Sequence, residues 1–203
     1  AIWEVQMGTK GEKTKHLICS ESYKLFAEKG YKDVTMKDIC DHTGLSRGGL
    51  YRHYGSTEQI FLEIVNFLLK NQKNEFESKI EMGVPATEIL HDVLTRYERE
   101  MVDGDSSLSL SIYEFFSNPN MSKSENSITQ QYISSKNMWI ELIEYGIETK
   151  EFNAIDPEAV FDLIVFSYQG VRMYSKLMDI DRNIPKRMIG QIKLLLLSDN
   201  EGV

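Results

Sequence analysis

Apolar residues recur along this chain with the period of an α-helix, and the alternation of a β-strand never persists. In residues 10–29, Ile18, Cys19 and Phe26 share one helical face. Gly30 follows directly and suits the left-handed residue that often ends a helix. The pattern predicts a first helix over residues 10–29 and an all-α fold.

The same period predicts further helices downstream, separated by Gly, Pro and Asn. Ser56 to Gln59 reads as a capping box, and Asp156 before Pro157 is typical of a helix start. We expect about nine helices: residues 10–29, 36–43, 47–53, 57–80, 86–102, 106–117, 122–149, 157–179 and 184–197. No run of eighteen apolar residues occurs, so no membrane span is expected.

Two short helices are predicted directly after the first. Thr35 can cap one of them, with Asp38 as its acidic capping partner, and Gly44 ends it. Ser46 can cap the other, over residues 47–53. A helix, a glycine-containing turn and a second helix are typical of a helix-turn-helix, whose second helix enters the major groove of DNA.

Side chains on these two helices are suited to DNA. Arg47 begins the second helix and can form paired hydrogen bonds with guanine. Gly48 and Gly49 each cost about 1 kcal/mol relative to Ala, but leave room for DNA to approach the backbone. Further candidates for base or phosphate contacts are Thr35, Lys37, Tyr51, Arg52 and His53. A surface hairpin whose basic residues merely face solvent is the alternative.

The distribution of charge and the two cysteines narrow the class of protein that this chain can be. Among 203 residues with a net charge of −8, residues 1–57 hold nine Lys/Arg against seven Asp/Glu, whereas residues 58–203 hold fourteen against twenty-four. An acidic remainder argues against a protein that coats nucleic acid along its whole surface. Cys19 and Cys40 lack metal-ligand spacing, so we expect them to fill the core, with no metal or cofactor, in a reducing cytoplasm.

The stretch TMKDICDHTGLSRGGLYRHYGSTEQIF, with LICSESYKLFAEKGY before it, resembles the N-terminal domain of the TetR family of bacterial transcriptional regulators. The resemblance covers roughly residues 12–65. It implies an all-α homodimeric repressor with a three-helix DNA-binding domain, residues 9–55 with the helix-turn-helix at about 35–54. A helical bundle for ligand binding and dimerisation would follow, residues 56–203.

The resemblance also assigns residues to DNA. Positions that commonly touch DNA in the family are occupied here by Thr35, Lys37, Arg47, Gly48, Tyr51 and His53. Gly49 departs from the usual Thr, Ser or Ala, and Thr57 stands where a Lys often binds phosphate. A weaker phosphate contact is therefore expected at Thr57.

A small-molecule effector is expected inside the middle helices, as in the family. The candidate contacts are aromatic or acidic: Phe67, Tyr97, Tyr113, Glu114, Phe116, Tyr132 and Trp139. Such residues are more often plain core, and Glu114 can instead point outward between apolar stripes. A small apolar or aromatic effector is expected, and a cation is compatible with Glu114 and the aromatic faces.

The last two predicted helices are apolar on more than one face, so we expect them to form a homodimer interface. The candidate residues are Phe166, Ser167, Gly170, Ile189 and Leu196. A two-fold dimer places two reader helices about 34 Å apart on a palindromic double-stranded DNA operator.

Other functions remain open at this point. An activator or a ligand-independent regulator of the same fold is the nearest alternative. A small helical enzyme is remote, because the sequence has no Ser/His/Asp set, metal spacing or phosphate loop. Residues 1–6 are left aside, since Met7 is a candidate start. The operator, the regulated genes and the effector cannot be named from the sequence.

Overall fold

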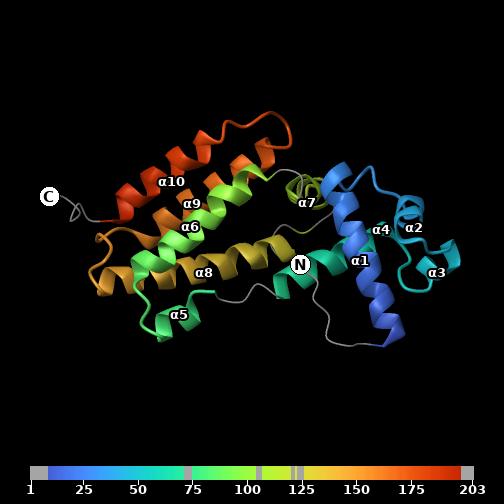
Figure 1. Ribbon diagram of the computed structural model, residues 1–203, viewed down its shortest axis with the longest axis horizontal. Helices are drawn as coiled ribbons and strands as arrows, with labels where there is room; N and C mark the ends of the chain where they lie inside the picture. Colours follow the sequence, from blue (N-terminus) through green and yellow to red (C-terminus); the bar gives the residue numbers. More distant parts are fainter. Residues whose placement is uncertain (1–8, 71–74, 104–106, 120–121, 123–125, 198–203) are drawn as a thin grey trace. The chain divides into compact units, whose positions relative to one another are not determined.

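The computed structural model describes residues 9–70, 75–103, 107–119, 122 and 126–197 (Figure 1). Residues 1–6 thus lie outside the described part of the chain. Within the described residues all the regular elements are helices: α1 Lys10–Lys29, α2 Met36–Thr43, α3 Arg47–Tyr51, α4 Thr57–Lys70, α5 Glu77–Glu81, α6 Ala86–Val102, α7 Ser109–Phe116, α8 Ser127–Glu148, α9 Pro157–Tyr174 and α10 Asn183–Leu196. None of these helices is both long and apolar enough to cross a membrane.

Most predicted helices are confirmed, and the differences are local. The helix expected over residues 57–80 is wrong: α4 and α5 are separate, and Glu75 and Phe76 between them lie in a turn. Phe76 is only 1% exposed, and its ring packs edge-on against the ring of Trp139. The helix expected over residues 157–179 ends earlier, at Tyr174.

The chain divides into two compact units. Unit 1 comprises Ala1–Asn71 and Asp105–Ser127, and therefore holds α1 to α4 together with α7. Unit 2 comprises Gln72–Gly104 and Ile128–Val203 and holds the other helices. The predicted boundary near residue 55 does not coincide with this division. A functional separation of residues 9–55 from residues 56–203 stays a prediction.

Unit 1 is built around α1. This helix packs against α2, α4 and α7, and α2 packs against α3. The expected buried face is confirmed, with Ile18 at 0% and Phe26 at 1% exposure. Cys19 and Cys40 are free and buried, as expected. Burial raises the pKa of the Cys19 thiol to about 11, so this cysteine is a protonated part of the core at neutral pH.

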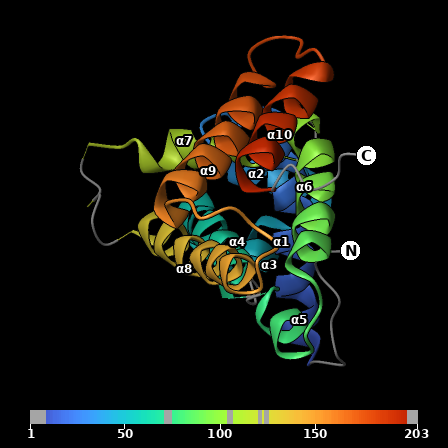
Figure 2. The ribbon, with the colours of Figure 1, turned by 90° about the vertical axis from the view of Figure 1, so that its left-hand side faces the viewer.

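Unit 2 has a separate core. Helices α6, α9 and α10 pack against one another, and Figure 2 shows them from another side, with α8 next to α9. Tyr132 of α8 donates a hydrogen bond to Asp162 of α9, 2.9 Å between oxygens. Trp139, 2% exposed, lies in the middle of this core with Phe161 and Ile164. Gly146 of α8 lies against the ring of Phe152, so this glycine allows a close approach.

Candidate nucleic-acid interface

The turn between α2 and α3 has the geometry that the sequence predicts. Gly44 ends α2 in the left-handed conformation, with φ 71°. Ser46 caps α3, since its Oγ accepts a hydrogen bond from the amide of Gly49 at 3.1 Å. Leu45 lies half-buried between the two caps and packs against the core of unit 1. These caps determine where α3 begins and thus which of its side chains reach the surface.

Helix α3 presents the predicted DNA-binding side chains to solvent. Arg47, Tyr51 and Arg52 are exposed, and Tyr51 is 53% exposed despite its large ring. Leu50 is 0% exposed and anchors α3 to the core. Within the described residues neither Arg47 nor Arg52 has an ion-pair partner in the protein. Both guanidinium groups are therefore available for an external anion.

The end of α3 differs from the prediction of residues 47–53. The helix ends at Tyr51, and Arg52 is its C-terminal cap with helical backbone angles. His53 follows in a turn and is half-buried. Tyr54 is 5% exposed and its hydroxyl lies 3.3 Å from the Cys19 Sγ. Helix α3 is thus shorter than predicted, and Tyr54 beyond its end is buried, as expected.

The two glycines of α3 have different surroundings. A Cβ built on Gly48 would meet no heavy atom within 4 Å. A Cβ on Gly49 would lie 3.3 Å from the Ser46 Oγ and would crowd the capping hydroxyl. Internal packing thus gives a reason for glycine at position 49. It gives none at Gly48, whose contact with DNA stays a prediction.

The start of α2 is a complete capping box. The Thr35 Oγ1 accepts from the Asp38 amide at 3.2 Å, and the Asp38 carboxylate accepts from the Thr35 amide at 2.9 Å. The Thr35 hydroxyl also donates to this carboxylate. These bonds from Thr35, with Lys29 nearby, lower the pKa of Asp38 to about 2. The Thr35 hydroxyl proton is therefore already donated to Asp38. The side chain of Lys37, in contrast, is exposed to solvent.

Helix α4 begins with Ser56, whose Oγ accepts from the Gln59 amide at 3.3 Å. The Gln59 side chain accepts from the Gly55 amide at 2.7 Å, one residue earlier than in the predicted capping box. Thr57 is half-buried at the first position of α4. Its role at DNA stays a prediction.

The predicted effector residues are divided between the two units. Phe67, Tyr113, Glu114 and Phe116 belong to unit 1. Tyr113 is 61% exposed, and Phe116 packs against the core of unit 1. Those of unit 2 are Tyr97, Tyr132 and Trp139. Tyr97 and Trp139 lie 6.0 Å apart between ring centroids, and Tyr97 lies 4.4 Å from Tyr168.

Glu114 has a structural role that the sequence did not reveal. Its carboxylate is half-buried and takes part in a hydrogen bond within unit 1, and a contact with a ligand stays a prediction. The Oε2 accepts a hydrogen bond from the backbone amide of Lys32 at 3.0 Å, in the loop after α1. Nothing in the local sequence links these two residues, because 82 positions separate them.

A cavity of about 440 Å³ opens in unit 2 along α6, next to α5. Phe76, Ile89 and Val93 contribute its apolar part, and the remaining lining is polar or charged. None of the seven predicted effector residues lines this cavity. Its charged side chains carry both signs, so they do not by themselves favour an anionic or a cationic ligand.

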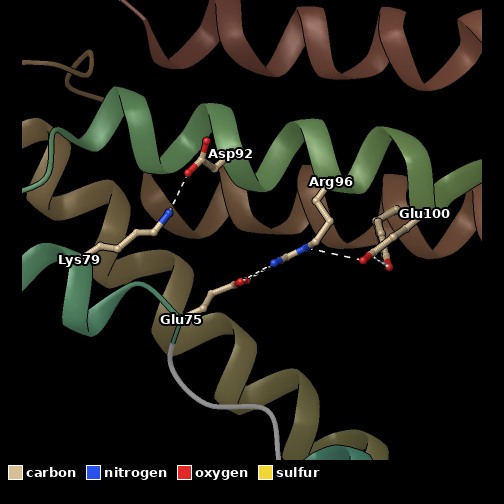
Figure 3. Close-up of polar contacts among 6 residues, drawn as sticks. Glu75, Lys79, Asp92, Arg96 and Glu100 are labelled. Carbon is tan, nitrogen blue, oxygen red and sulfur yellow. Dashed lines mark hydrogen bonds and ion pairs between the residues drawn. The ribbon is translucent and has the colours of Figure 1, made fainter. Parts of the chain in front are cut away.

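Ion pairs beside this cavity connect the α5 segment to α6 (Figure 3). Arg96 forms two hydrogen bonds with Glu75, 2.5 and 2.6 Å long, and its Nε lies 3.6 Å from Glu100. Lys79 of α5 lies 2.8 Å from Asp92 of α6. Since α5 has no buried residue of its own, these pairs and the neighbouring Phe76 hold it against α6.

The predicted dimer residues fall into two groups. Phe166 is 64% exposed and Gly170 is exposed, whereas Ser167 is half-buried. Ile189 and Leu196 are 4% and 0% exposed in the core of unit 2, so assigning them to the interface was wrong. Helix α10 is apolar on two faces, and Ile189 and Leu196 lie on the face that packs into the core. Large apolar residues on the outer surfaces of α9 and α10 are Leu163, Phe166, Met188, Leu194 and Leu195.

Among the described residues, no group of three or more His, Cys, Asp or Glu side chains is placed to hold a metal ion. The surface most suited to a macromolecular ligand is formed by α3 and the start of α2, because basic side chains gather there on the outside of the protein. Its exposed side chains include two arginines, one lysine and one tyrosine.

Comparison with known proteins places this surface in context. Residues 18–64 match the model of bacterial regulatory proteins of the tetR family. The uncharacterised HTH-type transcriptional regulator YfiR of Bacillus subtilis (strain 168) is 28% identical over 160 residues, which are 74% of this chain and 75% of that protein. The HTH-type transcriptional repressor KstR2 of Rhodococcus jostii (strain RHA1) is 26% identical over 163 residues, 76% and 74% of the two chains.

Solved structures show the same fold. A putative transcriptional regulator from Saccharomonospora viridis, in complex with choline, superposes with a TM-score of 0.74 at 16% identity. The match covers 92% of this chain and 99% of the other. The similarity therefore extends beyond the helix-turn-helix into unit 2.

Proposed function

Since the chain belongs to the TetR family of bacterial regulatory proteins, we propose that it is a homodimeric repressor that leaves its operator when a small molecule binds. Its relatives and structural neighbours are transcriptional regulators with a DNA-binding helix-turn-helix, not enzymes. The exposed face of α3 carries the proposal: Arg47, Tyr51 and Arg52 project from a helix that Leu50 fixes to the core.

On DNA, α3 would lie in the major groove. Arg47, its first residue, would form paired hydrogen bonds with a guanine, which select that base. Arg52, at its C-terminal end, and Lys37, at the start of α2, would bind phosphates and fix the register. Gly48 would let the backbone approach the DNA, since it has no side chain on an exposed part of α3.

A two-fold dimer is proposed through α9 and α10. Phe166 and Leu194 are 64% and 65% exposed, and Leu163 and Leu195 add further apolar surface. Exposed apolar groups of this size favour burial against a partner. Gly170 offers a site for close helix approach, because a Cβ there would meet nothing within 4 Å. A dimer of this kind would place two copies of α3 about 34 Å apart on a palindromic operator.

A small apolar or aromatic effector, cationic ones included, is proposed for unit 2. The choline complex of the S. viridis regulator supports a pocket for an organic cation in this fold. Tyr97 and Trp139 are the aromatic candidates here, but Trp139 is 2% exposed and Arg96 lies 5.5 Å from the Tyr97 ring centre. Their close packing favours one alternative, a ligand-independent regulator of the same fold.

Fluorescence anisotropy with the DNA upstream of the gene, and with a shuffled sequence of equal composition, tests the proposal. The full chain should bind the upstream DNA more tightly, and raising salt from about 50 to about 200 mM should weaken binding steeply. Sedimentation should show a dimer that Phe166→Glu converts to a monomer. Equal affinity for both DNAs would contradict a sequence-specific repressor, and an unchanged mass for Phe166→Glu would contradict this interface.

A further inference from the structure

Helix α7 holds the loop between α1 and α2. Its Ser111 Oγ, fully buried, donates to the carbonyl of Phe26 in the last turn of α1 at 2.7 Å. Its Phe115 ring lies 4.8 Å from the ring of Tyr31 between centroids. Its Glu114 carboxylate accepts from the Lys32 amide at 3.0 Å. All of these residues belong to unit 1, although α7 comes from a part of the sequence beyond the helix-turn-helix.

Gly30 and Glu114 fit each other closely. Gly30 ends α1 with φ 85° and ψ 171°, which is not the left-handed cap that the sequence suggested. A Cβ on Gly30 would lie 2.8 Å from the Glu114 Oε2. Glycine is therefore needed there for two reasons, its positive φ and the space that the carboxylate occupies.

The loop leads directly to the proposed DNA contacts. Val34, 4% exposed, anchors its far end in the core, and Thr35 then caps α2. Lys29 at the end of α1 lies 3.3 Å from Asp38 in the first turn of α2. The position of α2, and of Lys37 at its start, depends on how this short loop is held between its ends.

We propose that Glu114 is a positioning residue for DNA binding: by holding the Lys32 amide, it sets where α2 presents Lys37 to the phosphate backbone. This inference rests on the proposed function. Glu114 does not touch DNA itself. It acts through the loop, because a carboxylate that accepts an amide hydrogen bond fixes that amide more firmly than a neutral acceptor or water does.

The role has a signature that loss of stability alone would not produce. Lys37 is assigned to phosphate rather than to base edges, and phosphate contacts carry no sequence information. Because Leu50 anchors α3 to the core by itself, a shift at the start of α2 should weaken binding to operator and shuffled DNA by the same factor. The ratio of the two affinities, which Arg47 is proposed to determine, should stay unchanged.

The test compares Glu114→Ala with Ser111→Ala in the full chain, by anisotropy with both DNAs, at a temperature well below either unfolding transition. Ser111→Ala is the matched control, because it removes a buried bond between α7 and α1 but leaves the loop amide held. Glu114→Ala should weaken both affinities about five- to thirtyfold and speed hydrogen exchange at the Lys32 amide. Glu114→Gln, which keeps an acceptor oxygen, should restore much of the loss. Ser111→Ala should lower the melting temperature only.

If Glu114→Ala does not fold, Glu114→Asp replaces it, since the shorter side chain keeps the charge but withdraws the acceptor. Wild-type affinity in the folded Glu114 variant would overturn the inference alone. An equal loss of affinity in Ser111→Ala would also overturn it, because α7 would then act only through general stability. Failure of the unsubstituted chain to prefer operator DNA would overturn the proposed function and this inference with it.

Discussion

The substitution Gly48→Ala should change the stability of the folded protein and its affinity for DNA in opposite directions. Gly48 is the second residue of α3, and a Cβ there would meet no heavy atom within 4 Å. Replacing a helical glycine by alanine at such a position stabilises a protein by about 0.4–1 kcal/mol, because the unfolded chain loses freedom. The variant should therefore unfold at higher urea concentration than the wild type.

The same methyl group should weaken DNA binding. If the backbone at Gly48 lies against DNA, the added methyl group must push α3 and the DNA apart. Overpacking of this kind costs about 1–3 kcal/mol, and 1–2 kcal/mol corresponds to a loss in affinity of about five- to thirtyfold. Urea unfolding and anisotropy with operator DNA measure the two effects on one preparation.

Gly11→Ala is the matched control, since its Cβ would meet only the Thr9 Oγ1, at 3.9 Å, in the first turn of α1. It should gain stability as well but keep the affinity for DNA. Gly49→Ala should gain less stability than Gly48→Ala, because its Cβ would lie 3.3 Å from the Ser46 Oγ. A Gly48→Ala variant that binds operator as tightly as the wild type would refute the close approach of DNA at this residue.

Two further predictions concern the fold. Gly146→Ala should destabilise the chain by about 1–3 kcal/mol, because the added carbon would overlap the Phe152 ring. Gly190→Ala in α10 is the control, since its Cβ would meet nothing within 4 Å. Equal melting temperatures of the two variants would contradict this packing. The folded pKa of Asp38, about 2, lies below its ordinary 3.8, so its contribution to stability is present above pH 3.8 and is lost as the pH falls towards 2. Asp38→Asn should thus lose less stability than the wild type across that range, and parallel acid-unfolding curves would argue against the capping box.

Local chemical signals predicted several helix starts. Thr35 with Asp38, Ser46, and Asp156 before Pro157 each cap the helix that the sequence assigned to them. Each such signal involves groups within a few residues of one another, so a linear sequence contains the whole interaction. The same holds for α3, because Leu50 is its one large aliphatic residue and is buried, whereas Arg47 and Arg52 lie at the two ends of this short helix and are exposed.

Contacts over long sequence distances were not predictable in this way. Glu114 lies amid aromatic residues, and its partner is a backbone amide 82 residues away. Ile189 and Leu196 lie on a helix with two apolar faces, where periodicity alone does not identify the inner one. The Phe76 ring likewise packs against Trp139, far along the chain, and periodicity does not identify this partner.

The central claim is that α3 reads base sequence through Arg47. The most direct measurement compares the affinities of wild type, Arg47→Ala and Lys37→Ala for operator and shuffled DNA at one salt concentration. Arg47→Ala should lose about 1–3 kcal/mol of discrimination between the two DNAs, whereas Lys37→Ala should weaken both alike. An operator-to-shuffled ratio that Arg47→Ala leaves unchanged would contradict the account.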